Sequence, residues 1–87
     1  MTNTGGRKTV HIVRAEAIGG DALDIALSNG TVILLQTELI LTLPGFAPLR
    51  EDDRVLYPKT DGGSVYWRDG PRKLPLDEIM ELSFYGQ

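Results

Sequence analysis

Two short apolar runs, residues 22–28 and 31–36, flank the dipeptide Asn29-Gly30 and form the strongest pattern in the chain. An Asn-Gly pair accepts the positive φ angles of a type I′ turn, so the pattern predicts two antiparallel strands joined by a two-residue loop. That loop also sets which residues lie opposite one another. On the face that we expect to form the core, the pairs are Leu27 with Val32, Ile25 with Leu34, and Leu23 with Gln36.

The same pairing gives the hairpin a second apolar face, which carries Ile33 and Leu35. Aliphatic side chains of this size are not expected to remain in water, so something must cover them. A helix, the segment 39–49 or a second copy of the protein would serve, and the sequence leaves both intramolecular cover and an oligomer open. The candidate interface consists of Ile33, Leu35, Phe46 and Leu49.

Shorter signals predict the elements on either side of this hairpin. Residues 9–18 alternate as a strand, with a slip near Val13 and Ala15 that is typical of a β-bulge. Residues 37–43 fit either a helical turn or a longer strand, because periodicity does not separate the two over so short a run. Pro44-Gly45 ends this segment in either case.

The C-terminal third of the chain predicts two more strands and a helix. Residues 55–59 and 64–67 have strand-like patterns, and Asp69-Gly70 turns the chain after them. Pro75 suits the first position of a helix, which we place at about residues 75–83. The apolar stripe that we expect to face the core is Leu76, Ile79, Met80 and Phe84.

The predicted fold class is α+β: a small antiparallel, meander-like sheet of about five strands with one C-terminal helix. With 87 residues, the chain has the length of one domain. Residues 1–8 are polar and rich in Thr and Gly, so we expect them to form a flexible N-terminal arm. Residues 9–87 then form a single α+β domain.

Charge and composition restrict the function. The chain carries nine Lys and Arg against 12 Asp and Glu, a net charge of −3. Arg7, Lys8 and Arg14 lie before the first acidic residue, so the remaining body is acidic and a poor general binder of nucleic acid. The chain has no cysteine, which excludes disulfides and thiolate metal sites and fits a cytoplasmic protein. No apolar run approaches the ~20 residues that cross a bilayer, so we expect no membrane association.

Candidate chemistry is sparse. His11 is the single histidine, and the sequence offers it neither an orienting carboxylate nor a nucleophile in a recognisable context. The acids at 51–53 and Asp61 lack the alternating spacing of a calcium loop. The glycine pairs lack the spacing of a phosphate-binding loop. We therefore expect no catalytic residue, no metal and no cofactor, and no enzymatic activity.

Trp67, the single tryptophan, lies close in sequence to several cations. An aromatic side chain beside cations can stack on nucleic-acid bases or anchor a protein interface. An aromatic residue at the end of a strand also packs commonly on the core, so three interpretations stay open. The candidate binding residues are Trp67, Arg68, Arg72 and Lys73.

Four segments of the chain, taken in order, resemble one known family. They are Leu-Asp-Ile-Ala-Leu-Ser-Asn-Gly-Thr-Val at 23–32, Pro-Gly-Phe-Ala-Pro-Leu at 44–49, Gly-Gly-Ser-Val-Tyr-Trp-Arg-Asp-Gly at 62–70, and Leu-Pro-Leu-Asp-Glu-Ile at 74–79. With these segments the chain resembles the domain of unknown function 2442 family of small bacterial domains. The resemblance implies an α+β domain with a meander-like sheet and a C-terminal helix, and it implies no established activity.

Together these features favour a non-enzymatic binding or regulatory domain that acts through protein–protein contacts, as a homodimer or with another protein. The alternative is a nucleic-acid-associated accessory factor that uses the basic arm and the segment from Trp67 to Lys73.

Overall fold

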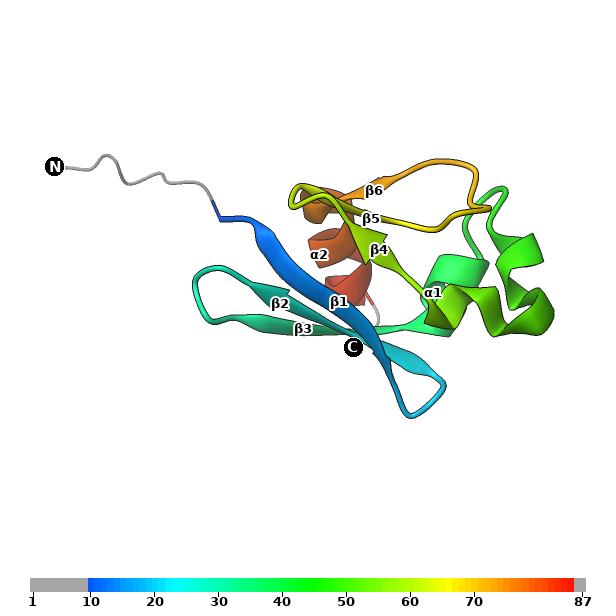
Figure 1. Ribbon diagram of the computed structural model, residues 1–87, viewed down its shortest axis with the longest axis horizontal. Helices are drawn as coiled ribbons and strands as arrows, with labels where there is room; N and C mark the ends of the chain where they lie inside the picture. The colour runs from blue at the N-terminus through cyan, green and yellow to red at the C-terminus, as the bar shows by residue number, and fades with distance from the viewer. Residues whose placement is uncertain (1–9, 86–87) are drawn as a thin grey trace, which may run out of the picture.

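The computed structural model of the chain describes residues 10–85 and is α+β (Figure 1). Its elements are β1 (Ile12–Ile18), β2 (Ala22–Leu27), β3 (Val32–Gln36), α1 (Thr37–Leu41), the 3₁₀ helix η1 (Ala47–Leu56), β4 (Lys59–Thr60), β5 (Ser64–Tyr66), β6 (Leu74–Pro75) and α2 (Leu76–Tyr85). The α+β class, the antiparallel meander and the C-terminal helix are confirmed. The strands form two three-stranded sheets, β1-β2-β3 and β4-β5-β6, and not the single sheet that we expected. The predicted arm at residues 1–8 lies outside the described residues.

The turn between β4 and β5 ties the two sheets and the last helix together. Ile12, at the start of β1, donates its N–H to the carbonyl oxygen of Gly62 at 2.7 Å. Leu76, the first residue of α2, donates its N–H to the carbonyl oxygen of Gly63 at 3.0 Å. Helix α2 then lies against β3 (Figure 1). The second sheet therefore positions the helix that covers the inner face of the first.

Strand β1 carries the expected bulge. Ile12 lies opposite Leu27, but Arg14 lies opposite Ala26, so Val13 is the extra residue on β1. After the bulge the register runs without a break to Ile18. The bulge at Val13 is therefore confirmed.

The hairpin of β2 and β3 has a three-residue loop, and the predicted two-residue turn is wrong. Leu27 donates its N–H to the carbonyl of Thr31 at 2.8 Å, and Gly30 donates to the carbonyl of Leu27 at 3.0 Å. Gly30 has φ 90°, whereas Asn29 does not have a positive φ. This is a type I turn followed by a left-handed glycine, the usual three-residue alternative to a type I′ turn. The loop shifts the register by one residue relative to our expectation.

The register shift reverses the two faces of β3, because successive side chains on a strand point to opposite faces. Leu23 lies opposite Leu35, and Ile25 lies opposite Ile33. These four side chains are buried, whereas Val32 and Leu34 are exposed. The predicted core pairs that contain Val32, Leu34 and Gln36 are therefore wrong.

The four residues of the candidate interface lie in the core of the protein. Ile33 and Leu35 occupy the inner face of β3, and Phe46 and Leu49 are also buried within the same apolar cluster. The cover over this face comes from the chain itself, so the intramolecular alternative is the one that the structure shows. Ile33, Leu35, Phe46 and Leu49 are not available as a contact surface.

Residues 37–41 and 47–56 are helical, where the sequence left a choice or predicted a strand. Thr37 starts α1, and its N–H and hydroxyl both donate to the carbonyl of Asp21, at 3.0 and 3.2 Å. The strand predicted at 55–59 is wrong for its first part, because Val55 lies in η1 and β4 begins only at Lys59. Within η1 the helix is interrupted by non-helical backbone at residues 51–53.

Helix α2 begins one residue after the predicted start and presents a different side to the core. Ile79 is fully buried and Leu76 and Leu82 pack against the core, whereas Met80 and Phe84 are 50% and 74% exposed. The predicted stripe is therefore wrong at Met80 and Phe84. The helix is rotated so that positions three residues apart, 76, 79 and 82, face the sheets.

Replacing Gly30 by alanine tests the three-residue loop. Only glycine adopts φ 90° without strain, and the space around its Cα is open, so Gly30→Ala is expected to lower the free energy of unfolding by about 1–2 kcal/mol through backbone strain alone. Gly63→Ala is the control, because Gly63 has open space and no positive φ, and we expect a change within about 0.5 kcal/mol. Urea unfolding measures both; equal stabilities would contradict the left-handed Gly30.

Candidate functional site

Trp67, the centre of the candidate binding cluster, is a core residue. The residue is 4% exposed, and its ring packs edge-on against Phe46 with the ring centroids 5.9 Å apart. The indole N–H donates to the carbonyl oxygen of Val55 at 2.9 Å. A buried indole needs such a partner, and here it fixes the end of η1 to the residue that follows β5. Core packing is thus the interpretation of Trp67 that the structure shows.

Arg72 pairs with Glu78 in α2. The two guanidinium nitrogens donate to the two carboxylate oxygens at 2.8 and 3.0 Å, and the guanidinium carbon lies 5.5 Å from the centroid of the Phe46 ring. The hydrogen bond from Arg72 holds the pKa of Glu78 below its usual value. A bidentate pair of this kind has a defined geometry, so Arg72 fixes the segment before β6 to the first turn of the helix.

Lys73 pairs with Asp61 in the turn between β4 and β5. Its Nζ donates to Asp61 Oδ2 at 2.8 Å and lies 5.2 Å from the centroid of the Tyr66 ring. Asp61 Oδ1 also accepts the N–H groups of Gly63 and Ser64 at 3.1 and 2.9 Å, and the Ser64 hydroxyl at 2.9 Å. The hydrogen bond from Lys73, supported by these donors, holds the pKa of the Asp61 carboxyl well below its usual range. Arg72 and Lys73 thus both act within the fold.

Arg68 differs from the other cations of the cluster. It is exposed, and within residues 10–85 it forms no ion pair. It lines a cleft of about 150 Å³ together with Tyr57, Arg54 and Asp69. Arg54 and Asp69 form an ion pair with an N–O distance of 3.5 Å. Small-molecule sites usually enclose about 300–1,000 Å³, so this cleft is too small for a typical ligand. The four candidate residues therefore do not converge on one site.

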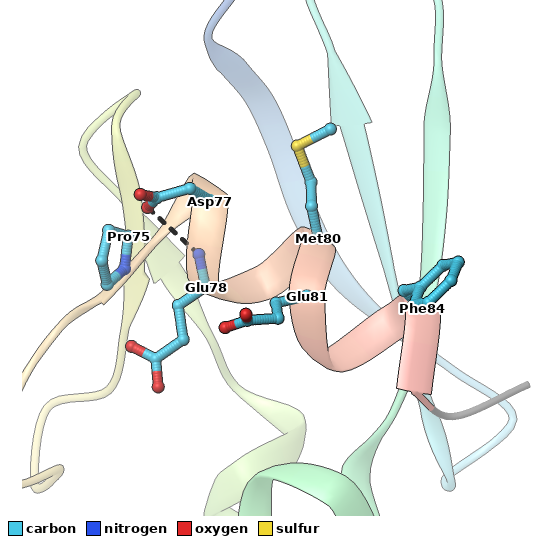
Figure 2. Close-up of a pocket in the computed structure, with 6 residues that line it drawn as sticks. All are labelled: Pro75, Asp77, Glu78, Met80, Glu81 and Phe84. Carbon is cyan, nitrogen blue, oxygen red and sulfur yellow. Dashed lines mark hydrogen bonds between the residues drawn. The ribbon is translucent and has the colours of Figure 1, made fainter.

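A larger hollow of about 730 Å³ runs along α2 (Figure 2). Its lining residues are Pro75, Asp77, Glu78, Met80, Glu81 and Phe84. All of them come from α2 and the residue before it, so no second element forms an opposite wall. The hollow is an exposed helix side with carboxylates and two large apolar side chains, and it has the character of a contact surface.

The other chemistry-bearing residues are used locally. His11 is exposed, and its main chain exchanges two hydrogen bonds with Ser28. Asp52, in the kink of η1, has its Oδ2 atom 3.7 Å from Nη2 of Arg54. Among residues 10–85, no three His, Cys, Asp or Glu side chains gather into a group that could hold a metal ion. No helix of this part of the chain is long and apolar enough to span a bilayer.

Exposed aliphatic side chains lie on the outer face of the β1-β2-β3 sheet. Val32 and Leu34 on β3 and Ile18 on β1 share this face, and Val13 is exposed at the bulge. Arg14 crosses the same face and pairs with Asp24 and Glu16 at 2.9 and 3.2 Å. We call Ile18, Val32 and Leu34 the outer apolar patch.

The sequence interpretation missed Val32 and Leu34 as surface residues. The signal that could have found them is Gln36, because the two-residue loop places its amide in the core opposite Leu23. A three-residue loop instead buries only aliphatic side chains between the two strands. These are Leu23, Ile25 and Leu27 on β2 and Ile33 and Leu35 on β3.

No protein-family model matches the chain, and no curated protein and no solved structure match it either. The resemblance to the domain of unknown function 2442 family therefore stays a prediction.

Replacing Trp67 by phenylalanine tests its structural role. Trp67→Phe removes the indole donor and leaves the Val55 carbonyl buried without its partner, which is expected to lower the free energy of unfolding by about 1–3 kcal/mol. Tyr57→Phe, at a mostly exposed ring, is the control and is expected to have little effect. A Trp67→Phe variant as stable as the wild type would show that the indole hydrogen bond does not support the core.

The Asp61–Lys73 pair predicts a pH dependence of stability. Because the folded state lowers the pKa of Asp61, its stabilisation is present above the unfolded pKa of about 4 and is lost as the pH falls toward the folded pKa. Asp61→Asn is therefore expected to be less stable than the wild type at pH 7, with a difference that narrows from pH 5 to pH 2.

Unfolding in urea at several pH values measures this difference. Lys73→Gln breaks the same pair from the other side, and we expect its difference from the wild type to narrow in the same direction. Stability curves of variant and wild type that run parallel from pH 7 to pH 2 would contradict the role of the pair.

Proposed function

We propose that this protein is a non-enzymatic binding or regulatory module that works through protein contacts, with a second copy of itself or with another protein. The observation that carries the proposal is the outer apolar patch, where Leu34 is 61% and Val32 51% exposed. Large apolar side chains that gather on one sheet face commonly mark a protein contact. The exposed Met80 and Phe84 on α2 add a second apolar surface.

The electrostatics favour protein over nucleic acid as the partner. Arg14, Arg72 and Lys73 are each held by a carboxylate at 2.8–2.9 Å, so their charge is already compensated within the fold. Binding to a phosphate backbone depends on cations that are free to replace counterions. The buried Trp67 also has no exposed face on which a base would stack.

The residues with catalytic potential serve the fold in the same way. Asp61 and Ser64 bond to each other and close the turn after β4, and Glu78 is held by Arg72. A cytoplasmic location belongs to the same proposal and rests on the cysteine-free sequence.

A photo-crosslinking amino acid at position 34 tests the proposal in cells. We expect a covalent protein adduct from position 34, because that side chain lies in the outer apolar patch. The control carries the same amino acid in place of Glu51, which is exposed in the kink of η1, and we expect no specific adduct there.

Fluorescence anisotropy with short single- and double-stranded oligonucleotides at low salt provides the counter-test. We expect no salt-sensitive binding by the purified chain. Absence of any protein adduct from position 34 would contradict the proposed function, and salt-sensitive oligonucleotide binding would favour the nucleic-acid alternative.

A further inference from the structure

Strand β3 is the open edge of its sheet. The strand order is β1-β2-β3, and no other strand within residues 10–85 pairs with the far side of β3. The opposite edge of this sheet is partly closed, because Ile12 of β1 bonds to Gly62. β3 is therefore the edge of this sheet that is open along its full length within these residues.

The hairpin bonds show which main-chain groups face this edge. Leu27 and Thr31 form a hydrogen-bonded pair at the end of the ladder. Such pairs alternate along an antiparallel ladder, so Ile33 and Leu35 bond to β2. The N–H and C=O groups of Val32 and Leu34 then point away from the sheet. An edge with unpaired N–H and C=O groups in this arrangement can form main-chain hydrogen bonds with another extended strand.

β3 lacks the features that keep edge strands apart. Segment 31–36 contains no charged residue, no proline and no glycine, and its side chains are apolar on both faces from Val32 to Leu35. Natural edge strands are commonly protected by lysine, proline or a bulge. Here the bulge lies on β1 and a proline lies in β6, so neither protects β3.

Helix α2 provides an apolar flank for an added strand. It lies against β3, and Met80 and Phe84, four residues apart, are both largely exposed. Figure 2 shows both side chains projecting from α2, with Phe84 drawn beside β3. Phe84 therefore adds apolar surface from α2 next to this edge, in addition to Val32 and Leu34 of the outer apolar patch.

We propose that β3 pairs antiparallel with β3 of a second copy of this chain, about a twofold axis beside Leu34. The inference rests on the proposed function and names its partner. Leu34 then exchanges both main-chain hydrogen bonds with Leu34 of the second copy, and Val32 lies opposite Gln36 of that copy. The two β1-β2-β3 sheets become one continuous sheet, and the apolar side chains of the two edges shield one another from water.

A second copy fits this edge better than an unrelated peptide for two reasons. The edge needs an uncharged strand that is apolar on both faces, and β3 has this composition. Antiparallel pairing about a twofold axis is also self-complementary, so one surface supplies both halves of the interface. Because only a short strand takes part, we expect a weak dimer, smaller than a standard stable interface.

Sedimentation velocity on the full chain tests the pairing. We expect the wild type to be dimeric at about 100 µM, where a complex with a micromolar Kd is nearly saturated. Leu34→Lys places like charges directly opposite one another and is expected to weaken the dimer at least about tenfold. Val13→Lys is the matched control, with similar exposure but on β1 at the opposite edge of the sheet, and it is expected to remain dimeric.

Circular dichroism and thermal unfolding verify that both lysine variants fold. A monomeric wild type at this concentration, or a folded Leu34→Lys variant that dimerises as tightly as the wild type, would overturn the pairing.

A disulfide tests the register. The chain has no cysteine, so Leu34→Cys introduces a single thiol. Residues opposite one another in a hydrogen-bonded antiparallel pair have Cα atoms about 5.5 Å apart, which is within the range of a disulfide. Mild oxidation is expected to give a covalent dimer of twice 9.6 kDa from Leu34→Cys and none from Val13→Cys. Cross-linking from Val13 but not from position 34 would overturn the proposed register.

These outcomes separate the two proposals. A monomeric wild type whose position 34 forms an adduct with a different protein overturns self-pairing and leaves the protein-contact function in place. A monomeric wild type with no protein adduct at all overturns both.

Discussion

Gly30, with its left-handed backbone, sets the arrangement on which the rest of this small fold depends. It closes a three-residue loop, and the loop fixes Ile33 opposite Ile25 and Leu35 opposite Leu23. Because one step of register turns every side chain of a strand over, this loop decides that β3 buries Ile33 and Leu35. The same choice leaves Val32 and Leu34 at the surface. Core and contact surface are therefore two consequences of one turn.

Polar contacts of the second sheet and of the segment that follows β5 keep α2 in place over that core. Trp67 bonds to the carbonyl of Val55, Arg72 to Glu78, and Lys73 to Asp61. These contacts join the segment 67–73 to η1, to α2 and to the turn after β4. Exposed ion pairs contribute little to stability individually, but here they fix the start of the helix and the turn after β4. The segment that gathers tryptophan and cations in the sequence thus works mainly as a closure of the fold.

Much of the fold could be predicted from the chain, and the failures share physical causes. The bulge at Val13 and the helix near Pro75 follow from local signals that tertiary packing did not overrule. The predicted register of β3 was wrong because Ser28-Asn29-Gly30 suits a three-residue loop as well as Asn29-Gly30 suits a two-residue loop. The prediction of the buried side of α2 was wrong at Met80 and Phe84, because a short amphipathic helix has several apolar side chains and only tertiary packing decides which of them are buried.

The candidate site was less predictable than the fold. Sequence proximity of Trp67 to Arg72 and Lys73 does not show that each cation has a carboxylate partner, since Glu78 and Asp61 reach them only in the folded chain. Conversely, Val32 and Leu34 look like ordinary core residues until the register is known. The surface that we propose for protein contact is therefore visible only through the structure.

Amide hydrogen exchange by NMR at two protein concentrations tests the central claim most directly, since it reports each main-chain bond of β3 separately. The structure predicts that the amides of Ile33 and Leu35 are protected at every concentration. It predicts that the amides of Val32 and Leu34 exchange rapidly in dilute solution and become protected as the concentration rises. Protection of Val32 and Leu34 in dilute solution, with rapid exchange at Ile33 and Leu35, would contradict the assignment of Val32 and Leu34 to the open edge. Rapid exchange of Val32 and Leu34 at all concentrations would contradict the pairing of β3 with a second copy.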